Sequence, residues 1–298
     1  MIQKIRDIAT QLEAVYPKDE AEGLAWWMAE ELSGLTRTQL QFGCKDTTFL
    51  RNTQEIIAAN ANLQEIISRL LHFEPIQYIF GHTLWCGLDL KVTPATLIPR
   101  PETAELVEAV SNCPFAISHL PFDTAHRSLR VLDVGTGSGC IAIALKKRHP
   151  EWEVTGIDIS KEAIEVAKEN ARRNGVEVEF READIFHLPF AIAHLPFDVV
   201  VSNPPYICNK EKGEMRRNVV DYEPHTALFV PDEDPLLFYR RIASLCAEQG
   251  KSVQLFFEIN EAYGEEISAM LGGLHYSDIR ITDDMYGKPR IIEARMAR

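Results

Sequence analysis

The sequence predicts an α/β protein with a mostly parallel sheet whose last strand runs antiparallel, together with a small N-terminal helical domain. In residues 1–75 the apolar side chains recur at helical spacing, and β-branched runs are scarce. From residue 130 onward, short apolar strands alternate with helical segments, which is the order typical of a parallel sheet. The last two strands, expected at 277–282 and 290–295, follow each other with no helix between them, so the chain must reverse direction there.

The chain is predicted to divide into three parts. Residues 1–75 carry three amphipathic stripes and form the helical domain. Residues 76–100 contain short strand-like segments around Gly87, which favours a β-hairpin linker. Residues 101–298 begin with Pro101, a residue type favoured at the first position of a helix, and continue as the α/β domain.

The elements of the α/β domain follow from its apolar runs, which are rich in Val, Ile and Phe and end at polar residues or turns. Helices are expected at 104–110 and 140–148, at about 235–247, and in a segment that ends near 271. Before the last two strands, we expect strands at 130–132, 153–157, 176–180, 197–202 and 252–259.

Composition excludes several classes of protein. The 298 residues include 44 acidic and 31 basic side chains, for a formal net charge of −13, which argues against bulk electrostatic binding of nucleic acid. The six cysteines have no C-x-x-C spacing and the nine histidines form no cluster, so we expect reduced thiols and no metal site. The N-terminus lacks a signal-peptide apolar region, and no apolar run approaches the roughly 20 residues of a membrane helix. We therefore expect a cytoplasmic protein without a membrane partner.

A glycine-rich loop joins the strand at 130–132 to the helix at 140–148. Its glycines let the backbone approach a ligand closely, and the helix N-terminus favours a negatively charged group such as a carboxylate. A dinucleotide fingerprint needs glycine where this chain has Cys140, so a nicotinamide-dependent dehydrogenase is disfavoured. The loop runs through Asp133, Val134, Gly135, Thr136, Gly137, Ser138 and Gly139.

Acidic residues end the next two strands. Asp158, with Ile159 after it, follows the strand at 153–157, and its carboxylate can accept hydrogen bonds from both hydroxyls of a ribose. Asp184 and Ile185 follow the next strand, where an adenine amino group and ring could be held. Any one of these positions could be an ordinary solvated strand end, but their regular order favours a site for an adenosine-containing cofactor.

The most informative segment is Asn203-Pro204-Pro205-Tyr206, which follows the strand at 197–202. Prolines cannot continue a hydrogen-bonded ladder, so the strand ends in a turn that offers carbonyl oxygens and one asparagine amide. The turn lies at the carboxyl edge of the strand, where open α/β sheets bind their ligands. Such a turn can accept hydrogen bonds from a planar NH2 group, with Tyr206 placed to pack on its flat face. In isolation the four residues would only be a turn.

Taken together, these motifs resemble the protein-(glutamine-N5) methyltransferases that modify peptide chain release factors, the PrmC or HemK family. Ala104 departs from the pattern, because family members usually carry another acidic residue there, and residues 111–128 look like an insertion. A near-repeat that relates 114–123 to 189–198 has no functional interpretation. The resemblance covers nearly the whole chain and rests on the segments 74–81, 97–103, 133–139, 203–207, 223–228 and 287–290.

The resemblance implies a Rossmann-like, seven-stranded, mostly parallel sheet with an antiparallel last strand, and S-adenosyl-L-methionine (SAM) as the cofactor. Gly135, Gly137 and Gly139 would line the methionine end of SAM, with Asp158 at the ribose. The full set of cofactor-binding residues that we predict is Asp133, Gly135, Thr136, Gly137, Ser138, Gly139, Asp158, Ile159, Asp184, Ile185 and Asn203.

The acceptor implied by the resemblance is the side-chain amide nitrogen of the glutamine in the GGQ motif of class 1 release factors. The Asn203 side-chain oxygen and the Pro204 carbonyl would each accept an amide N–H, and Tyr206 would pack on the amide plane; these three are the predicted catalytic residues. Pro205 and Arg100 complete the predicted substrate-binding set. Arg100 and Glu102 either orient the substrate or the loop over the cofactor, or form an ion pair that fixes the inter-domain linker. The helical domain would recognise the release factor.

Two other functions fit part of the pattern. An amino-group methyltransferase acting on DNA or RNA, of the adenine-N6 type, would use the same turn on an exocyclic NH2, but the acidic balance and the absence of a basic, aromatic-rich recognition segment argue against it. A non-catalytic SAM-binding protein is expected to have lost the Asn203 amide or a loop glycine, and both are present.

Overall fold

The computed structural model describes residues 2–42, 62–113, 128–187, 197–248 and 252–296. The chain forms two compact units, a helical unit (Met1–Gly81 with Arg216–Tyr222) and a sheet unit (His82–Met215 with Glu223–Arg298). Most of the near-repeat and of the insertion at 111–128 lies outside the described residues. So do Ile56, Ile57 and Asn60, the first residues of the third predicted stripe. The predicted boundaries at residues 75 and 100 stay predictions.

The helical unit buries one side of each amphipathic segment. Of the predicted first stripe, Ile5, Ile8, Ala9 and Leu12 enter the apolar core, whereas Ile2 is exposed. The second helix ends at Gly34, which takes the left-handed conformation that side chains disfavour. The described helices are α1 (Ile2–Leu12), α2 (Lys18–Ser33), α3 (Arg37–Phe42), α5 (Asn62–Leu71), α6 (Ile76–Phe80) and the short α12 (Arg217–Val220).

A segment from much later in the chain completes the helical unit. Arg216 Nη1 donates to Glu20 Oε1 at 3.0 Å, and the Tyr222 hydroxyl donates to the His72 carbonyl at 2.9 Å. The Arg217 guanidinium lies over the Phe73 ring, 4.6 Å from its centroid. Long-range polar contacts of this kind leave no periodic signal in the sequence, so the return of this segment was not anticipated.

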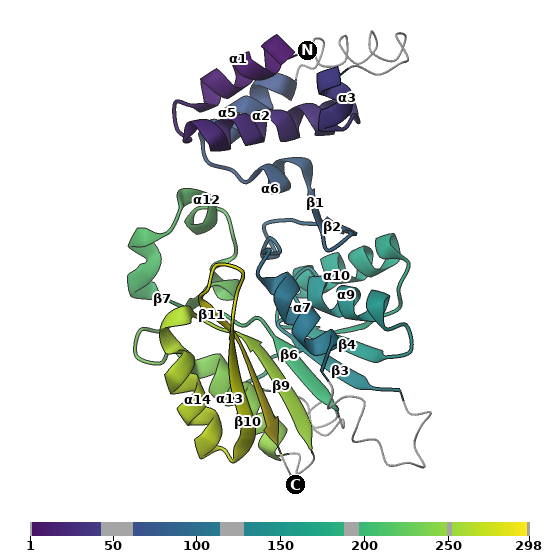
Figure 1. Cartoon of the computed structure of the whole chain (residues 1–298), viewed down its shortest axis with the longest axis vertical. Coiled ribbons are helices and arrows are strands. Elements are labelled where there is room, and N and C mark those ends of the chain that lie inside the picture. Colours follow the sequence, from purple (N-terminus) through teal and green to yellow (C-terminus); the bar gives the residue numbers. More distant parts are fainter. Residues whose placement is uncertain (1, 43–61, 114–127, 188–196, 249–251, 297–298) are drawn as a thin grey trace. The chain divides into compact units, whose positions relative to one another are not determined.

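The sheet unit is built on a seven-stranded sheet in the order β10-β11-β9-β6-β3-β4-β5 (Figure 1). Neighbours from β9 to β5 run parallel, whereas β11 is antiparallel to both β9 and β10. The predicted mixed sheet with an antiparallel last strand is therefore confirmed. The strands are β3 (Arg130–Val134), β4 (Glu153–Asp158), β5 (Glu179–Glu182), β6 (Val199–Ser202), β9 (Val253–Glu258), β10 (Tyr276–Asp283) and β11 (Pro289–Met296).

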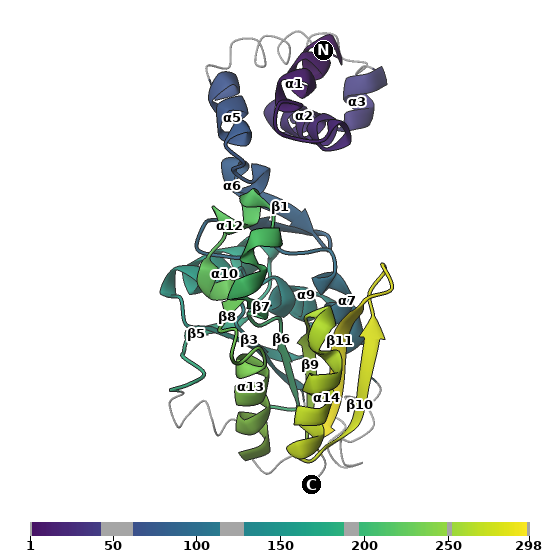
Figure 2. The same ribbon diagram turned by 90° about the vertical axis from the view of Figure 1, so that its left-hand side faces the viewer.

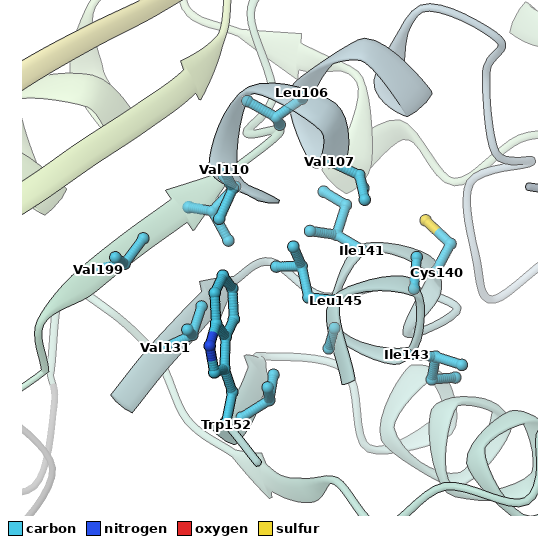
Figure 3. Close-up of a cluster of buried hydrophobic side chains, with 14 of the residues drawn as sticks. Leu106, Val107, Val110, Val131, Cys140, Ile141, Ile143, Leu145, Trp152 and Val199 are labelled. Carbon is cyan, nitrogen blue, oxygen red and sulfur yellow. The ribbon is translucent and has the colours of Figure 1, made fainter. Parts of the chain in front are cut away.

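Helices bury both faces of the sheet. Alternate residues of the central strands point to opposite faces, so Val131 and Val199 pack in one apolar cluster, and Leu132 and Val200 pack in the other. The first face is covered by α7 (Thr103–Ser111), α9 (Cys140–Arg148) and α10 (Lys161–Asn174), and Figure 3 shows part of its cluster. The second is covered by α13 (Leu237–Glu248) and α14 (Gly264–Gly273), which lie side by side in Figure 2.

The predicted hairpin is present as β1 (His82–Trp85) and β2 (Leu88–Lys91), and a buried side chain of α10 contacts it. Asn170 of α10 accepts a hydrogen bond from the Lys91 backbone N–H at 2.7 Å. Its Nδ2 donates to the carbonyls of Lys91 and Ser138, at 2.9 and 2.8 Å. Asn170 thus joins the hairpin to the glycine-rich loop.

Two strands begin more than one residue later than predicted; β6 begins at Val199 instead of residue 197, and the second shift is larger. The strand expected at 176–180 is observed as β5, from Glu179 to Glu182. The cause is the end of α10, where Gly175 is left-handed and the Val176 N–H donates back to the Ala171 carbonyl. Because this N–H closes the helix, it is not available for the sheet ladder.

The remaining described elements are short. β7 (Ile207–Cys208) and β8 (Phe229–Val230) pair in parallel after the Asn203 turn. Three 3₁₀ segments are η2 (Asn209–Glu214), η3 (His225–Ala227) and η4 (Glu261–Tyr263). Within the described ranges, no helix is long and apolar enough to cross a membrane.

Gly156 in β4 provides a test of the packing around the glycine-rich loop. A Cβ at this position would lie 2.7 Å from two Phe180 ring atoms and 2.8 Å from Thr136 Oγ1. We expect Gly156→Ala to lower the free energy of unfolding by about 1–3 kcal/mol, as overpacking does in other cores. Urea denaturation measures this difference.

The matched control is Gly272→Ala in α14, where the nearest atom would be Ile279 Cδ1 at 3.9 Å. An alanine there fits the helix and reduces the freedom of the unfolded chain, so stability should be unchanged or slightly higher. Equal stability of the two variants would contradict the close packing around Gly156.

Candidate active site

A cavity of about 390 Å³ lies at the carboxyl edge of the parallel strands of the sheet unit. It is lined by the ends of β3, β4, β5 and β6, by two loops (95–97 and 224–229) and by α13. Of the predicted site residues it contains Gly135, Gly137, Asp158, Ile159, Asp184, Ile185, Asn203, Pro204 and Pro205. The other predicted residues do not line it: Asp133, Thr136, Ser138, Gly139, Tyr206 and Arg100.

The glycine-rich loop is held on the neighbouring strand by backbone hydrogen bonds. The N–H groups of Gly135 and Thr136 both donate to the Ile157 carbonyl at 2.9 Å, and the Gly137 N–H donates to Asp158 Oδ2 at 2.9 Å. Gly139 has a different role, because it begins α9 in the left-handed conformation and its Cβ would lie 3.0 Å from Ala167 Cβ. Gly135 and Gly137 thus shape the cavity wall, and Gly139 permits the packing behind it.

Asp133 lies behind the loop and is fully buried. Its Oδ2 accepts hydrogen bonds from Thr136 Oγ1 at 2.6 Å and from the Ala142 N–H at 3.2 Å, while its Oδ1 has no hydrogen-bond partner among the described residues. Burial raises the pKa of Asp133 to about 7. Asp133 and Thr136 therefore fix the loop against α9, and their predicted contact with the cofactor stays a prediction.

Asp158 ends β4 and faces the cavity. Its two oxygens accept backbone hydrogen bonds from Gly137 and Ser160, each at 2.9 Å. Burial raises the pKa of this carboxyl group. Since a carboxylate oxygen can accept more than one hydrogen bond, Asp158 can still receive the hydroxyls of a ligand. The adjacent Ile159 is 62% exposed, which gives the cavity an apolar surface beside the carboxylate.

The wall after β5 combines an acid with an aromatic ring. Asp184 Oδ1 accepts from the Phe186 N–H at 2.9 Å, and its Oδ2 lies 2.8 Å from His187 Nδ1. The hydrogen bond with His187 is the largest of the effects that lower the pKa of Asp184. The rings of Phe186 and Phe238 meet edge to face at 5.5 Å, and both line the cavity. Sequence reasoning missed Phe186, although its place directly after Asp184 and Ile185 could have indicated it.

The Asn203 turn contributes the wall after β6. Asn203 Nδ2 donates to Thr103 Oγ1 at 3.3 Å. Tyr206 does not line the cavity, and its hydroxyl donates to Glu258 Oε1 at 3.2 Å. Burial raises the pKa of Tyr206, and the nearby Glu258 carboxylate adds to this effect. Packing of its ring on a substrate amide stays a prediction.

Arg100 forms an ion pair across two of the loops. Its Nη2 donates to Glu223 Oε1 at 2.5 Å, and Glu223 Oε2 accepts from the Ile98 N–H at 3.1 Å. The Trp85 Nε1–H donates to the Arg100 carbonyl at 2.8 Å. The pair joins segment 95–100 to segment 223–229, and both segments line the cavity. Sequence reasoning placed Arg100 at the substrate but did not assign residues 95–97 or 224–229 to the wall, although both loops adjoin or contain motifs that carried the resemblance.

Comparisons with known proteins agree with this geometry. Residues 125–254 match a family model described as a methyltransferase domain. A release factor glutamine methyltransferase of Bacteroides thetaiotaomicron is 42% identical over 288 residues, covering 96% of this chain and 97% of the relative. One from Streptococcus pneumoniae is 34% identical and covers 94% of this chain and 93% of the relative.

This chain belongs to the release factor glutamine methyltransferase family. The resemblance drawn from the motifs is confirmed, and the protein is a SAM-dependent methyltransferase. Among solved structures, the hMettl16 catalytic domain in complex with MAT2A 3'UTR hairpin 6 matches with a TM-score of 0.52 and 20% identity, over 71% of this chain and 76% of that one. That likeness concerns the fold alone.

Asp133→Asn tests the buried carboxylate behind the loop. The pKa of Asp133 is about 7 in the folded protein, against 3.8 ordinarily, so the folded state holds a proton that the unfolded state releases. The contribution of Asp133 to the wild-type free energy of unfolding is then fully present at low pH and falls as the pH rises toward 7. The variant lacks this loss, so its free energy of unfolding relative to wild type should rise by roughly 1 kcal/mol per pH unit between pH 5 and 7. Parallel pH profiles in urea denaturation would contradict this expectation.

Proposed function

We propose that this protein transfers the methyl group of SAM to the side-chain amide nitrogen (N5) of the glutamine in the GGQ motif of class 1 peptide chain release factors. The names of the relatives support this substrate. The observation that carries the chemistry is the position of the Asn203 turn, which lines the cavity. The Asn203 side-chain NH2 donates a hydrogen bond to Thr103. The Asn203 Oδ1 and the Pro204 carbonyl thus remain as acceptors for the two N–H groups of a primary amide.

The cavity residues also fit the cofactor. SAM, when bound, supplies a methyl group that its positively charged sulfur makes electrophilic. Asp158 would accept the ribose hydroxyls, and Ile159, Ile185 and Phe186 offer apolar surfaces for the adenine ring. Gly135 and Gly137, which have no side chains, would let the backbone approach the methionine portion. Asp184 would lie near the adenine amino group.

Positioning is the main task of the protein groups in this reaction. An amide nitrogen is a weak nucleophile because its lone pair is delocalised, so in-line placement against the methyl carbon has to supply much of the rate. Two acceptors at fixed positions hold the amide plane and stabilise the positive charge that develops on nitrogen. The proton can leave for water after transfer, since the methylated, protonated amide is a strong acid. We therefore assign no general base.

Recognition of the release factor is proposed for the helical unit. Its described surface includes the polar and charged side of α2, from Asp19 and Glu20 to Glu30. A folded substrate that presents its glutamine on a loop would need contacts remote from the methylated atom. All the residues that we assign to SAM and to the reacting amide belong to the sheet unit, so the helical unit is available for this recognition.

The substrate and the methylated atom can be determined in one assay. The purified full chain is incubated with labelled SAM and a purified class 1 release factor, and the product is located by mass spectrometry. We expect one methyl group on the glutamine of the GGQ motif. Label in DNA or ribosomal RNA, with none in the protein, would contradict the proposal and favour the nucleic-acid alternative.

Asn203→Ala should separate catalysis from cofactor binding. Loss of one oriented acceptor is expected to lower kcat/KM for the release factor by at least about a hundredfold. The SAM dissociation constant, measured by calorimetry, should change little because the cofactor would be held mainly by other residues. Turnover near the wild-type rate would contradict the proposed role of Asn203.

Asp158→Ala is the matched control, because it should produce the opposite pattern. Removal of an ionised acceptor for the ribose is expected to weaken SAM binding by roughly tenfold or more. Saturating SAM should then restore much of the turnover. Unchanged SAM affinity in this variant would remove Asp158 from the ribose.

A further inference from the structure

A buried carboxylate beneath the Asn203 turn has no role in the reaction described above. Glu258 ends β9 and is 1% exposed. Its Oε2 accepts a hydrogen bond from Thr103 Oγ1 at 2.6 Å, and its Oε1 accepts from the Tyr206 hydroxyl at 3.2 Å. Burying a carboxyl group costs free energy unless it is hydrogen-bonded. The two hydrogen bonds that Glu258 accepts offset this cost, and both come from residues at or next to the Asn203 turn.

The same threonine also contacts the asparagine of the turn. Thr103 lies at the start of α7, in the segment 97–103, and its Oγ1 is 3.3 Å from Asn203 Nδ2. Asn203 and Tyr206 are therefore both connected to Glu258, one through Thr103 and the other directly. The two ends of the turn are anchored on one carboxylate.

The direction of these hydrogen bonds is fixed by proton count. A hydroxyl has a single hydrogen, and an ionised carboxylate can only accept, so the Thr103 hydrogen is donated to Glu258. Thr103 Oγ1 can then only accept from its other neighbour. The Asn203 group that faces Thr103 must be the NH2, because the Asn203 oxygen would meet a lone pair of the hydroxyl.

Two hydrogen-bond donors, Thr103 and Tyr206, stabilise the ionised form of Glu258 against the cost of its burial. Burial raises the pKa of this group, while the hydrogen bond from Thr103 and the positive charge of Arg290 act in the opposite direction. Arg290 is held close by a hydrogen bond from its Nη1 to the Ile259 carbonyl, at 3.3 Å.

We propose that Thr103 and Glu258 are positioning residues that set the orientation of the Asn203 amide, so that its oxygen and not its NH2 is presented to the incoming primary amide. This inference rests on the proposed function, in which the acceptor substrate is an NH2 group. A flipped Asn203 would present a donor to a donor, and the substrate would lose one of its two acceptors. The threonine of segment 97–103 thus acts on the reaction through Asn203, without touching either substrate.

Thr103→Val tests the proposal, because valine keeps the shape of threonine and removes the hydroxyl. We expect kcat for release factor methylation to fall by roughly tenfold to a hundredfold, since the Asn203 NH2 loses its acceptor and the amide is free to turn. The KM for SAM should stay close to the wild-type value. Thr103→Ser keeps the hydroxyl and is expected to restore most of the lost rate.

Glu258→Gln is the second variant, and it acts on the direction of the hydrogen bonds. A glutamine can donate its own NH2 to Thr103, which releases the threonine hydrogen toward Asn203 and favours the flipped amide. We expect a lower kcat with unchanged SAM affinity. This variant keeps the test valid if Thr103→Val does not fold.

The orientation itself can be read without any substrate. In NMR spectra of the full chain, the Asn203 side-chain NH2 signals, identified by their loss in Asn203→Ala, should show hydrogen bonding in wild type and Thr103→Ser but not in Thr103→Val. Unchanged NH2 signals in Thr103→Val would overturn the inference, whatever the substrate. A wild-type kcat in Thr103→Val would overturn it too. Absence of release factor methylation by wild type would instead count against the proposed function, and the NMR result would still decide the orientation.

Discussion

The parallel alignment of β3, β4, β6 and β9 is the constraint on which the site depends. Strands that run in one direction bring their carboxyl ends to one edge of the sheet, so residues far apart in the sequence become neighbours. This places Gly135, Asp158 and Asn203 around one cavity, with Glu258 beneath the Asn203 turn. The burial of both faces by helices keeps these strand ends in fixed register.

Hydrogen-bond acceptors dominate this edge. Asp133, Asp158 and Glu258 are all carboxyl groups whose pKa values are raised by burial, and each accepts hydrogen bonds from backbone or hydroxyl donors. They shape the glycine-rich loop and the Asn203 turn from behind, and only Asp158 among them lines the cavity. The arrangement suits reactants that bring their own donors, such as ribose hydroxyls and a primary amide.

Sequence reasoning predicted the central strands well because they are apolar on both faces and end at distinctive turns. The Asn203 turn and the glycine-rich loop were placed correctly at the cavity because each directly follows one of these strands. Sequence reasoning did not find the loops at 95–97 and 224–229, since their position depends on the pair between Arg100 and Glu223, which are 123 residues apart. The link between Thr103 and Glu258 spans 155 residues and likewise has no local signal.

The absence of a local signal for long-range contacts also explains why some site residues have other contacts than the sequence predicted. Asp133 and Thr136 were predicted to bind the cofactor because they belong to the loop motif. In the structure they hold that loop against α9 and do not line the cavity, so direct contact with the cofactor stays a prediction. Tyr206 was predicted to face the substrate, and in the structure its hydroxyl reaches the buried Glu258. A motif records which residues are needed together, whereas only the fold shows which of them face the cavity.

The orientation of the Asn203 amide is the central claim, and a double-mutant cycle between Thr103 and Asn203 tests it most directly. Methyl transfer to the release factor is measured for wild type, Thr103→Val, Asn203→Ala and the double variant at saturating SAM. If Thr103 acts through Asn203, the Thr103→Val change should lower the rate in the wild-type background and have almost no effect in the Asn203→Ala background. The same fold reduction in both backgrounds would show that Thr103 acts independently of Asn203 and would contradict the account.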